Sequence, residues 1–283
     1  MALDDRFVRV DGLNTRYFED GAGPAVLLLH GAAFGSSADV WRRTLPRLAR
    51  AGVRAIAYDH PGFGLTDNPS DATAAYRRDF IPSFMDALGL EQAAIVGHSA
   101  SGGQAMDLAL RHPERVSRLM VLGTRSLLPP LPDAEGEASG PGDPEPTSEP
   151  TLEDARALLE EQLFNHHLIT PEVLELRLRL AVGKNHEASQ QRRQAGRGGQ
   201  GRPATPPWQR LAEVRVPLLF LYGANDGGDP PRRIARAREL YPTLEFHIAD
   251  GCKHLVQWDA EEEFVALATR FLASGAPATA QAR

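Results

Sequence analysis

The chain has 283 residues, of which 42% are hydrophobic, so it can bury the core of one large domain and is not a disordered protein. Its formal net charge of −6 arises from both signs of charge spread along the sequence, which leaves no basic stripe for a nucleic-acid backbone. A single cysteine, Cys252, cannot form an internal disulfide, and no Cys/His spacing is typical of a metal site. We therefore expect a reducing compartment and no bound metal.

The first ten residues, MALDDRFVRV, lack the charged and then apolar pattern of a signal segment. No apolar run approaches the length that spans a bilayer. These features predict a cytoplasmic protein with a small-molecule substrate and with neither a nucleic-acid nor a membrane partner. The sequence is compatible with a homodimer as well as with a monomer.

Strand and helix patterns alternate through most of the chain. Residues 7–19 alternate as two short strands, and continuous apolar runs follow, as expected for strands that are covered on both faces. Helical patterns between the runs predict βαβ units, and hence a mostly parallel sheet of eight strands flanked by helices. The six predicted buried strands are residues 25–30, 53–59, 93–98, 118–124, 216–223 and 244–250.

The alternation is interrupted by an insert between the fourth and the fifth of these predicted strands. Residues 127–150 are dominated by Pro, Gly and acidic side chains and predict a flexible linker. Residues 151–164 and 169–180 then predict two amphipathic helices. A second run of low order, residues 187–207, closes the insert.

The chain is therefore predicted to contain a core, an insert and a tail. The α/β core comprises residues 1–126 and 208–275, the insert is a helical lid of residues 127–207, and residues 276–283 form a disordered tail. An insert at this point would lie over the carboxyl ends of the strands. That edge is where open α/β sheets bind their ligands.

The stretch IVGHSASGGQ, residues 95–104, holds two serines between a predicted strand and a predicted helix. A nucleophile at such a junction lies on a sharp turn, which tolerates only small side chains two residues before and after it. Around Ser99 these positions are Gly97 and Ser101, whereas Ser101 itself would lie further from the end of the strand. The pattern favours Ser99 as the nucleophile and leaves Ser101 as the alternative.

A serine hydroxyl needs a base within hydrogen-bond reach, and the base needs an acid that fixes its tautomer. His254 follows the last predicted strand, and Asp226 follows the strand before it, so both fall at the same sheet edge as Ser99. Asp229 and Asp250 are the competing acids. Asp229 lies further from its strand in a Gly- and Pro-rich loop, and Asp250 lies only four residues before the histidine, so Asp226 is preferred.

Backbone amides are needed to stabilise the oxyanion that forms when a serine attacks a carbonyl group. The amide of Ala100 at the start of a helix is one candidate, and the amide of Ala32 in the loop HGAAFG is the other. The glycines of the chain match neither the dinucleotide nor the P-loop pattern. We therefore expect no cofactor.

Five motifs, HGAAFG, DHPGFG, GHSAS, LYGAND and GCKHLVQW, occur in this order. Together they resemble the α/β-hydrolase fold superfamily across nearly all of the chain. Within it the chain looks most like the meta-cleavage product hydrolases, serine-dependent enzymes that hydrolyse a carbon–carbon bond in vinylogous diketones, and the insert resembles their lid. The resemblance implies substrate contacts for His30, Ala33, Phe34, His98, Arg177, Leu255 and Trp258.

Three features differ from the pattern of that group. HGAAFG replaces an HGSGPG-like loop, His98 replaces an asparagine and Leu255 replaces a tryptophan. We therefore expect a different substrate for a metal-free serine hydrolase that acts on an activated carbonyl compound, namely an ester, a lactone or the carbon–carbon bond of a diketone-like compound. A non-hydrolytic lyase or a ligand-binding member of the same fold is the alternative.

Overall fold

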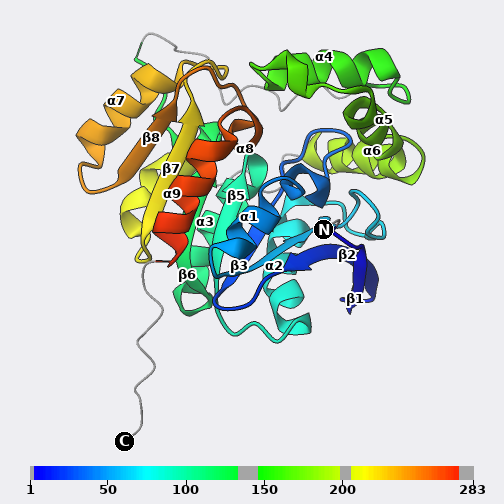
Figure 1. Ribbon diagram of the computed structural model, residues 1–283, viewed down its shortest axis with the longest axis horizontal. Coiled ribbons are helices and arrows are strands. Elements are labelled where there is room, and N and C mark those ends of the chain that lie inside the picture. Colours follow the sequence, from blue (N-terminus) through cyan, green and yellow to red (C-terminus); the bar gives the residue numbers. More distant parts are fainter. Residues whose placement is uncertain (1–2, 133–145, 198–204, 274–283) are drawn as a thin grey trace, which may run out of the picture.

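The computed structural model describes residues 3–132, 146–197 and 205–273. In these residues eight strands form one sheet in the order β1-β2-β4-β3-β5-β6-β7-β8 (Figure 1). β1 pairs antiparallel with β2, and β2 pairs antiparallel with β4, while the other neighbours are parallel. The predicted mostly parallel eight-stranded sheet is confirmed. The strands are β1 (Arg6–Val10), β2 (Leu13–Asp20), β3 (Ala25–Leu29), β4 (Arg54–Tyr58), β5 (Ala93–His98), β6 (Val116–Leu122), β7 (Leu218–Gly223) and β8 (Glu245–Ala249).

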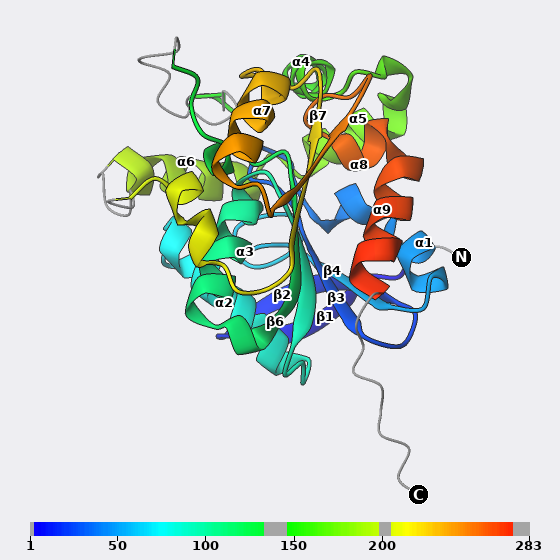
Figure 2. The ribbon, with the colours of Figure 1, turned by 90° about the vertical axis from the view of Figure 1, so that its left-hand side faces the viewer.

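Helices cover both faces of the sheet, which is why its central strands are apolar throughout. One buried cluster joins one side of the strands to α2, α3 and α7, and a second joins the other side to α1 and α9. Figure 2 shows the two helical layers on either side of the sheet. Alternate residues of β3 contribute to opposite clusters, Leu27 to the first and Leu28 to the second. The helices of the core are α1 (Leu45–Arg50), α2 (Ala74–Ala87), α3 (Ala100–Arg111), α7 (Pro230–Leu240), α8 (Val256–Asp259) and α9 (Glu261–Ala273).

Short 3₁₀ turns connect several of these elements. They are η1 (Ala38–Trp41), η2 (Pro113–Arg115), η3 (Arg125–Leu127), η4 (His166–Leu168) and η5 (Pro207–Glu213). In the part of the chain that the structure describes, no helix has the combined length and apolar character needed to cross a bilayer.

In its described residues, 127–132, 146–197 and 205–207, the insert contains three α-helices, α4 (Leu152–Gln162), α5 (Pro171–Arg179) and α6 (Lys184–Arg197). Thr151 and Asp154 form a capping box at the start of α4. The prediction of low order from residue 187 was wrong, because α6 continues to Arg197. Ala, Glu, Gln and Arg dominate this stretch and favour a helix. The end of that run (198–204), much of the predicted linker (133–145) and the predicted tail (276–283) lie outside the described residues.

The insert is fastened to the core at two separate points. The carboxylate of Asp259 on α8 accepts hydrogen bonds from the amides of Phe164 and Asn165, each 2.9 Å long. At the other point, the side-chain amide of Asn185 on α6 donates to the carbonyl oxygen of Gly64 over 3.0 Å. Along the chain, α5 lies between these two anchors and α4 ends just before the first of them; both helices lie above the carboxyl edge of the sheet (Figure 1).

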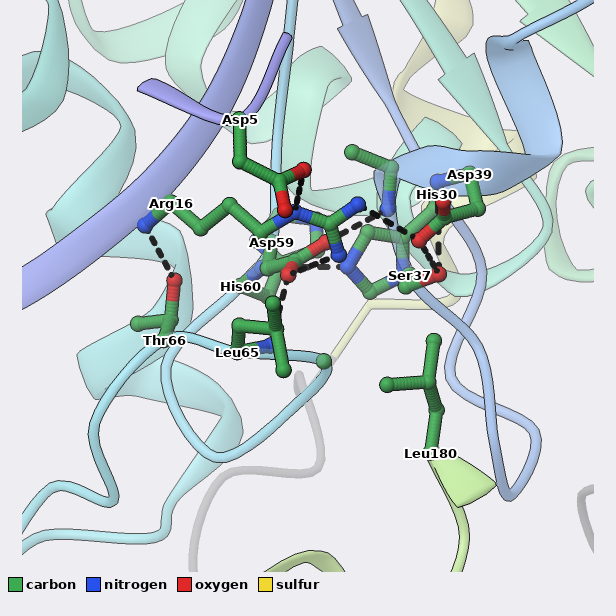
Figure 3. A network of polar contacts seen from close by, with 12 residues as sticks. Asp5, Arg16, His30, Ser37, Asp39, Asp59, His60, Leu65, Thr66 and Leu180 are labelled. Atoms are coloured by element: carbon green, nitrogen blue, oxygen red, sulfur yellow. Dashed lines mark hydrogen bonds and ion pairs between the residues drawn. The ribbon is translucent and has the colours of Figure 1, made fainter. Parts of the chain in front are cut away.

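Arg16 of β2 joins the loops that follow β3 and β4. It is only 2% exposed, and its guanidinium donates to Asp5, Asp39 and Asp59 over distances of 2.9, 2.9 and 3.1 Å (Figure 3). Burial raises the pKa of Asp59 to about 6, against the opposing effect of Arg16. Gly64, with φ +53°, is required beside this carboxylate, because a Cβ atom there would lie 2.0 Å from Asp59 Oδ2. The DHPGFG motif thus has a structural role.

Replacing Arg16 with methionine should lower the free energy of unfolding by about 3–5 kcal/mol at neutral pH, since the buried carboxylate of Asp59 loses its counter-ion and Asp39 keeps only its ion pair with Arg42. Denaturant titration measures this loss. Arg6→Met is the matched control: Arg6 is 52% exposed at its side chain and pairs with Glu19 at the surface, so its loss should cost about 0–1 kcal/mol. Equal losses in the two variants would contradict this account of the network.

Candidate active site

Ser99 lies at the junction of β5 and α3 in a backbone conformation that non-glycine residues rarely adopt, with φ 56° and ψ −125°. The sharp turn requires a small neighbour at Gly97, because a Cβ atom there would lie 2.7 Å from the Cα atom of Gly102. β5 therefore packs directly against the first turn of α3. This close contact holds Ser99 at the carboxyl edge of the sheet.

His254 and Asp226 complete a chain of hydrogen bonds with Ser99. His254 Nε2 lies 2.9 Å from Ser99 Oγ, and His254 Nδ1 lies 2.9 Å from Asp226 Oδ2. Burial raises the pKa of Asp226, but hydrogen bonds from His254 and from the Gly227 amide outweigh burial, so its pKa lies below the ordinary value. The ionised carboxylate can only accept. It therefore keeps the proton of His254 on Nδ1 and leaves Nε2 to accept the serine hydrogen.

The contacts of the alternative nucleophile and of the two alternative acids show that they lie outside this chain of hydrogen bonds. Ser101 Oγ donates to the carbonyl oxygen of His30, away from His254. Asp229 caps the start of α7, and Asp250 is exposed. The hydroxyl, imidazole and carboxylate that come together are those of Ser99, His254 and Asp226.

The two predicted oxyanion amides are both available as donors. Ala100 is the first residue of α3, where an amide has no partner within its own helix. Ala32 lines a pocket together with Ser99 and His254. Among the described residues, neither amide donates a hydrogen bond. Both can therefore donate to an oxygen atom bound beside Ser99.

The pocket around Ser99 is formed by the loops after β3 and β5, the loop before α8, and the insert. Of the predicted substrate contacts, His30, Ala33, His98, Arg177 and Leu255 line it. Arg177 reaches the pocket because α5 packs closely on the loop after β3. The full lining is His30, Gly31, Ala32, Ala33, Ser36, Val40, His98, Ser99, Gln162, Arg177, His254 and Leu255.

Two predicted contacts, Phe34 and Trp258, do not line this pocket. Phe34 is buried against Ala155 and Leu158 of α4, so it supports the insert from below. Trp258 lies on the short helix α8 and packs against Leu159 and Leu163 of the insert, and its indole N–H donates to the Val40 carbonyl oxygen over 2.7 Å. Both side chains pack the insert against the core.

Gln162, at the end of α4, is a lining residue that sequence reasoning missed. Its side chain is buried and accepts a hydrogen bond from Arg177 Nη2 over 3.4 Å. Its carbonyl oxygen accepts from the Leu255 amide over 3.0 Å. In the sequence it is one polar residue of an amphipathic helix, so no local signal distinguishes it.

His98 is a buried, neutral histidine in the pocket. Its Nε2 lies 3.0 Å from the carbonyl oxygen of His254, which can only accept, so Nε2 carries the hydrogen. Burial lowers the pKa of His98 to about 3. The unfolded chain takes up a proton here below about pH 6.5, whereas the folded chain does so only near pH 3. Folding stability is therefore lost as the pH falls through this window.

We expect His98→Asn to remove this loss. Between about pH 6 and 5, the free energy of unfolding of the wild type should fall more steeply than that of the variant, by up to about 1.4 kcal/mol per pH unit. Urea titrations at several pH values measure the two slopes. The offset between the proteins at pH 7.5 reports the change in packing and in the hydrogen bond to the His254 carbonyl oxygen. Parallel slopes would show that His98 is not held neutral.

Residues 24–261 match the alpha/beta hydrolase fold family. The chain belongs to this family. It is 30% identical over 268 residues to a 2-hydroxymuconate semialdehyde hydrolase of Pseudomonas sp. (strain CF600), with 93% of this chain and 91% of that protein covered. It is also 30% identical over 266 residues to a 2-hydroxy-6-oxo-6-phenylhexa-2,4-dienoate hydrolase of Burkholderia cepacia, with 90% of each covered.

Solved structures of α/β hydrolases agree with the sequence relatives. A serine hydrolase involved in carbazole degradation matches with a TM-score of 0.80 at 26% identity, covering 96% of this chain and 99% of that one. A meta-cleavage product hydrolase from Pseudomonas fluorescens IP01 matches with a TM-score of 0.74 at 28% identity, covering 95% and 97%. The predictions of the family and of a serine hydrolase are confirmed.

Proposed function

We propose that this α/β hydrolase cleaves the carbon–carbon bond beside the ketone of a vinylogous diketone that carries a carboxylate. The observation on which this rests is the pocket itself: Arg177 lines it together with Ser99 and His254. A guanidinium is suited to bind a carboxylate in two parallel hydrogen bonds. The relatives named above are hydrolases of 2-hydroxy-6-oxo-dienoates and a related semialdehyde, which supports the same substrate class here.

In the proposed first step, Ser99 Oγ attacks the ketone carbon while His254 Nε2 takes the hydroxyl proton. Asp226 holds the resulting imidazolium in place. The negative charge that develops on the ketone oxygen is stabilised by the amides of Ala32 and Ala100. Loss of one such donor typically reduces kcat by about 10²- to 10³-fold.

The next step needs the diketo form of the substrate, in which the hydroxyl proton of the dienol has moved to the carbon beside the ketone and this carbon is saturated. Collapse of the tetrahedral adduct breaks the bond between this carbon and the former ketone carbon, and the bonding electron pair passes through the neighbouring C=C into the distant carbonyl group, which becomes a dienolate. The proton on His254 is delivered to the dienolate oxygen, and the acyl group stays on Ser99. A water molecule, deprotonated by His254, then hydrolyses this ester and restores the serine hydroxyl. The sum is one substrate and one water giving two carboxylate products and one proton.

We also assign the insert, residues 127–207, the role of a lid that carries the carboxylate-binding group. Gln162 and Arg177 both lie on its helices and contact each other. α4 and α5 would thus bind one end of the substrate, while the core performs the chemistry on the other. The neutral imidazoles of His30 and His98, whose pKa values burial lowers to about 3, leave Arg177 as the cationic group for the acid.

The test compares two substrates in parallel, 2-hydroxy-6-oxo-6-phenylhexa-2,4-dienoate and p-nitrophenyl acetate. The wild type should cleave the dienoate with the higher kcat/KM. Arg177→Met should raise KM for the dienoate about 10- to 100-fold, the value of one charged hydrogen bond, and should change ester hydrolysis little.

The matched control is Arg179→Met, because Arg179 lies on the same helix with its side chain exposed. It should leave KM for both substrates unchanged. Ester hydrolysis without any dienoate cleavage would contradict the proposal and favour an esterase or lactonase. An equal loss of both activities in Arg177→Met would show that Arg177 does not bind the carboxylate.

A further inference from the structure

Ser101 occupies the position where a strict G-x-S-x-G pattern has its last glycine. It lies in the first turn of α3, two residues after Ser99, and is 2% exposed. Its hydroxyl donates to the carbonyl oxygen of His30 over 2.5 Å, and it lies 3.0 Å from His60 Nε2. The second serine of this turn thus contacts the loop after β3 instead of His254.

The direction of every proton in this contact is fixed. The His30 carbonyl can only accept, so the Ser101 hydroxyl donates to it and accepts from His60 Nε2–H. His60 Nδ1 then carries no hydrogen, and it has no hydrogen-bond partner among the described residues. Burial lowers the pKa of His60 well below its ordinary value, so the ring stays neutral.

The same two loops share a second contact through the His60 backbone. The His60 amide donates to His30 Nε2 over 3.0 Å, which places the His30 ring hydrogen on Nδ1. Nδ1 then donates to the Gly31 carbonyl oxygen over 2.7 Å. Ser101 and His60 therefore fix the carbonyl of His30 directly and that of Gly31 through the His30 ring. The Figure 3 view shows His30 and His60 next to the Arg16 network that joins the same loops.

His30 and Gly31 come immediately before Ala32, whose amide is one of the two proposed oxyanion donors. The loop HGAAFG has little side-chain bulk of its own at Gly31, Ala32 and Ala33 to hold this amide in place. The Ser101 hydroxyl ties the peptide before the amide to the helix that begins at the nucleophile. One buried hydroxyl thus links the loop that carries the Ala32 amide to the helix that follows Ser99.

We propose that Ser101 and His60 are positioning residues that hold the Ala32 amide where the oxyanion develops. The proposal rests on the proposed function of Ser99. Because an oxyanion donor acts mainly on the transition state, its displacement lowers kcat and changes KM little. A displacement of about 1 Å can reduce the rate about 100-fold. The test therefore separates kcat from KM and adds a probe of the oxyanion site.

The experiment measures steady-state kinetics with the dienoate and the second-order rate of labelling by a fluorophosphonate, in which the serine oxygen displaces fluoride and the phosphoryl oxygen lies in the oxyanion site. Ser101→Ala should lower kcat and the labelling rate about 10- to 100-fold, with KM within about threefold. His60→Leu should do the same. The double variant should be no slower than the slower single variant, because both residues act through the same carbonyl.

His60→Gln is the rescue variant, since its side-chain amide can donate to Ser101 as the ring Nε2–H does; its kcat should return to within about threefold of the wild type. Thr44→Val is the matched control: it removes a buried hydroxyl that, just before α1, donates to the carbonyl oxygen of Trp41. It should leave kcat and labelling unchanged. Near-ultraviolet circular dichroism checks that each variant is folded, and the His60 pair carries the test if Ser101→Ala does not fold.

Three results separate the outcomes. If Ser101→Ala is folded and keeps kcat and labelling within about twofold, the positioning role is wrong. If His60→Gln is as slow as His60→Leu, the hydrogen bond to Ser101 has no positioning effect. If the wild type itself is not labelled, or if labelling survives in Ser99→Ala, the proposed function fails instead.

Discussion

Replacing Ser99 with alanine should reduce kcat for the dienoate by about 10⁶-fold and abolish labelling by a fluorophosphonate. The variant keeps the turn, the pocket and the His254–Asp226 contact, but it has no oxygen that can form the acyl intermediate. The remaining activity would come from binding and from the oxyanion amides. Steady-state kinetics measures the loss, and mass spectrometry of the intact protein measures the labelling.

Ser117→Ala serves as the control, because Ser117 lies near the amino end of β6, at the opposite edge from the pocket. It should keep full activity and labelling. Labelling that survives in Ser99→Ala and disappears in Ser101→Ala would assign the nucleophile to the other serine of the turn. We expect Ser99→Ala to lose the label and Ser101→Ala to keep it. Ser99 lies within hydrogen-bond distance of His254, whereas Ser101 donates to the carbonyl oxygen of His30.

The second large effect is expected for Asp226→Asn, which should lower kcat about 10⁴-fold while leaving the fold intact. Asp226 Oδ1 accepts the Gly227 amide over 2.8 Å, and Oδ2 accepts His254 Nδ1–H over 2.9 Å. An asparagine must keep its oxygen toward the Gly227 amide, so its NH₂ group faces His254. The imidazole then carries its hydrogen on Nε2 and can no longer accept the proton of Ser99.

Asp229→Asn offers a control of the same chemical change in the same loop. Asp229 caps α7 by accepting the Arg232 amide, and asparagine is an equally good capping residue. Its kcat should therefore match that of the wild type. A loss of activity in Asp229→Asn, with Asp226→Asn unaffected, would exchange the roles of the two acids.

The sheet and the residues around Ser99 could be predicted because they depend on patterns that are local in sequence. Apolar runs between helical patterns identify buried parallel strands, and their carboxyl ends must share one edge. Ser99, Asp226 and His254 each follow such a run closely, so their meeting follows from the topology alone. The choice of Ser99 over Ser101 followed from the same distance to a strand end.

The pocket's roof could not be predicted in the same way, because it depends on how the insert packs on the core. The resemblance to the meta-cleavage product hydrolases implies that Phe34 and Trp258 contact the substrate. In the structure they pack beneath the insert instead. Gln162 looks like a solvent-facing polar residue in sequence, yet it is buried beside Arg177. From residue 187 the sequence predicts low order because the polar and charged residues there carry no apolar periodicity, but their helix propensity is high and α6 continues to Arg197.

The two anchors of the insert distinguish the contacts that hold it on the core from the helical residues that can be replaced. The anchor at Asp259 lies on α8 just beyond His254, and the anchor at Asn185 meets the glycine turn that also surrounds Asp59. Substitutions along α5, which lies between these two attachment points, would reshape the roof of the pocket and its charge, whereas Ser99, His254 and Asp226 all lie on the core. In this architecture, the substrate specificity can change while the catalytic residues stay the same.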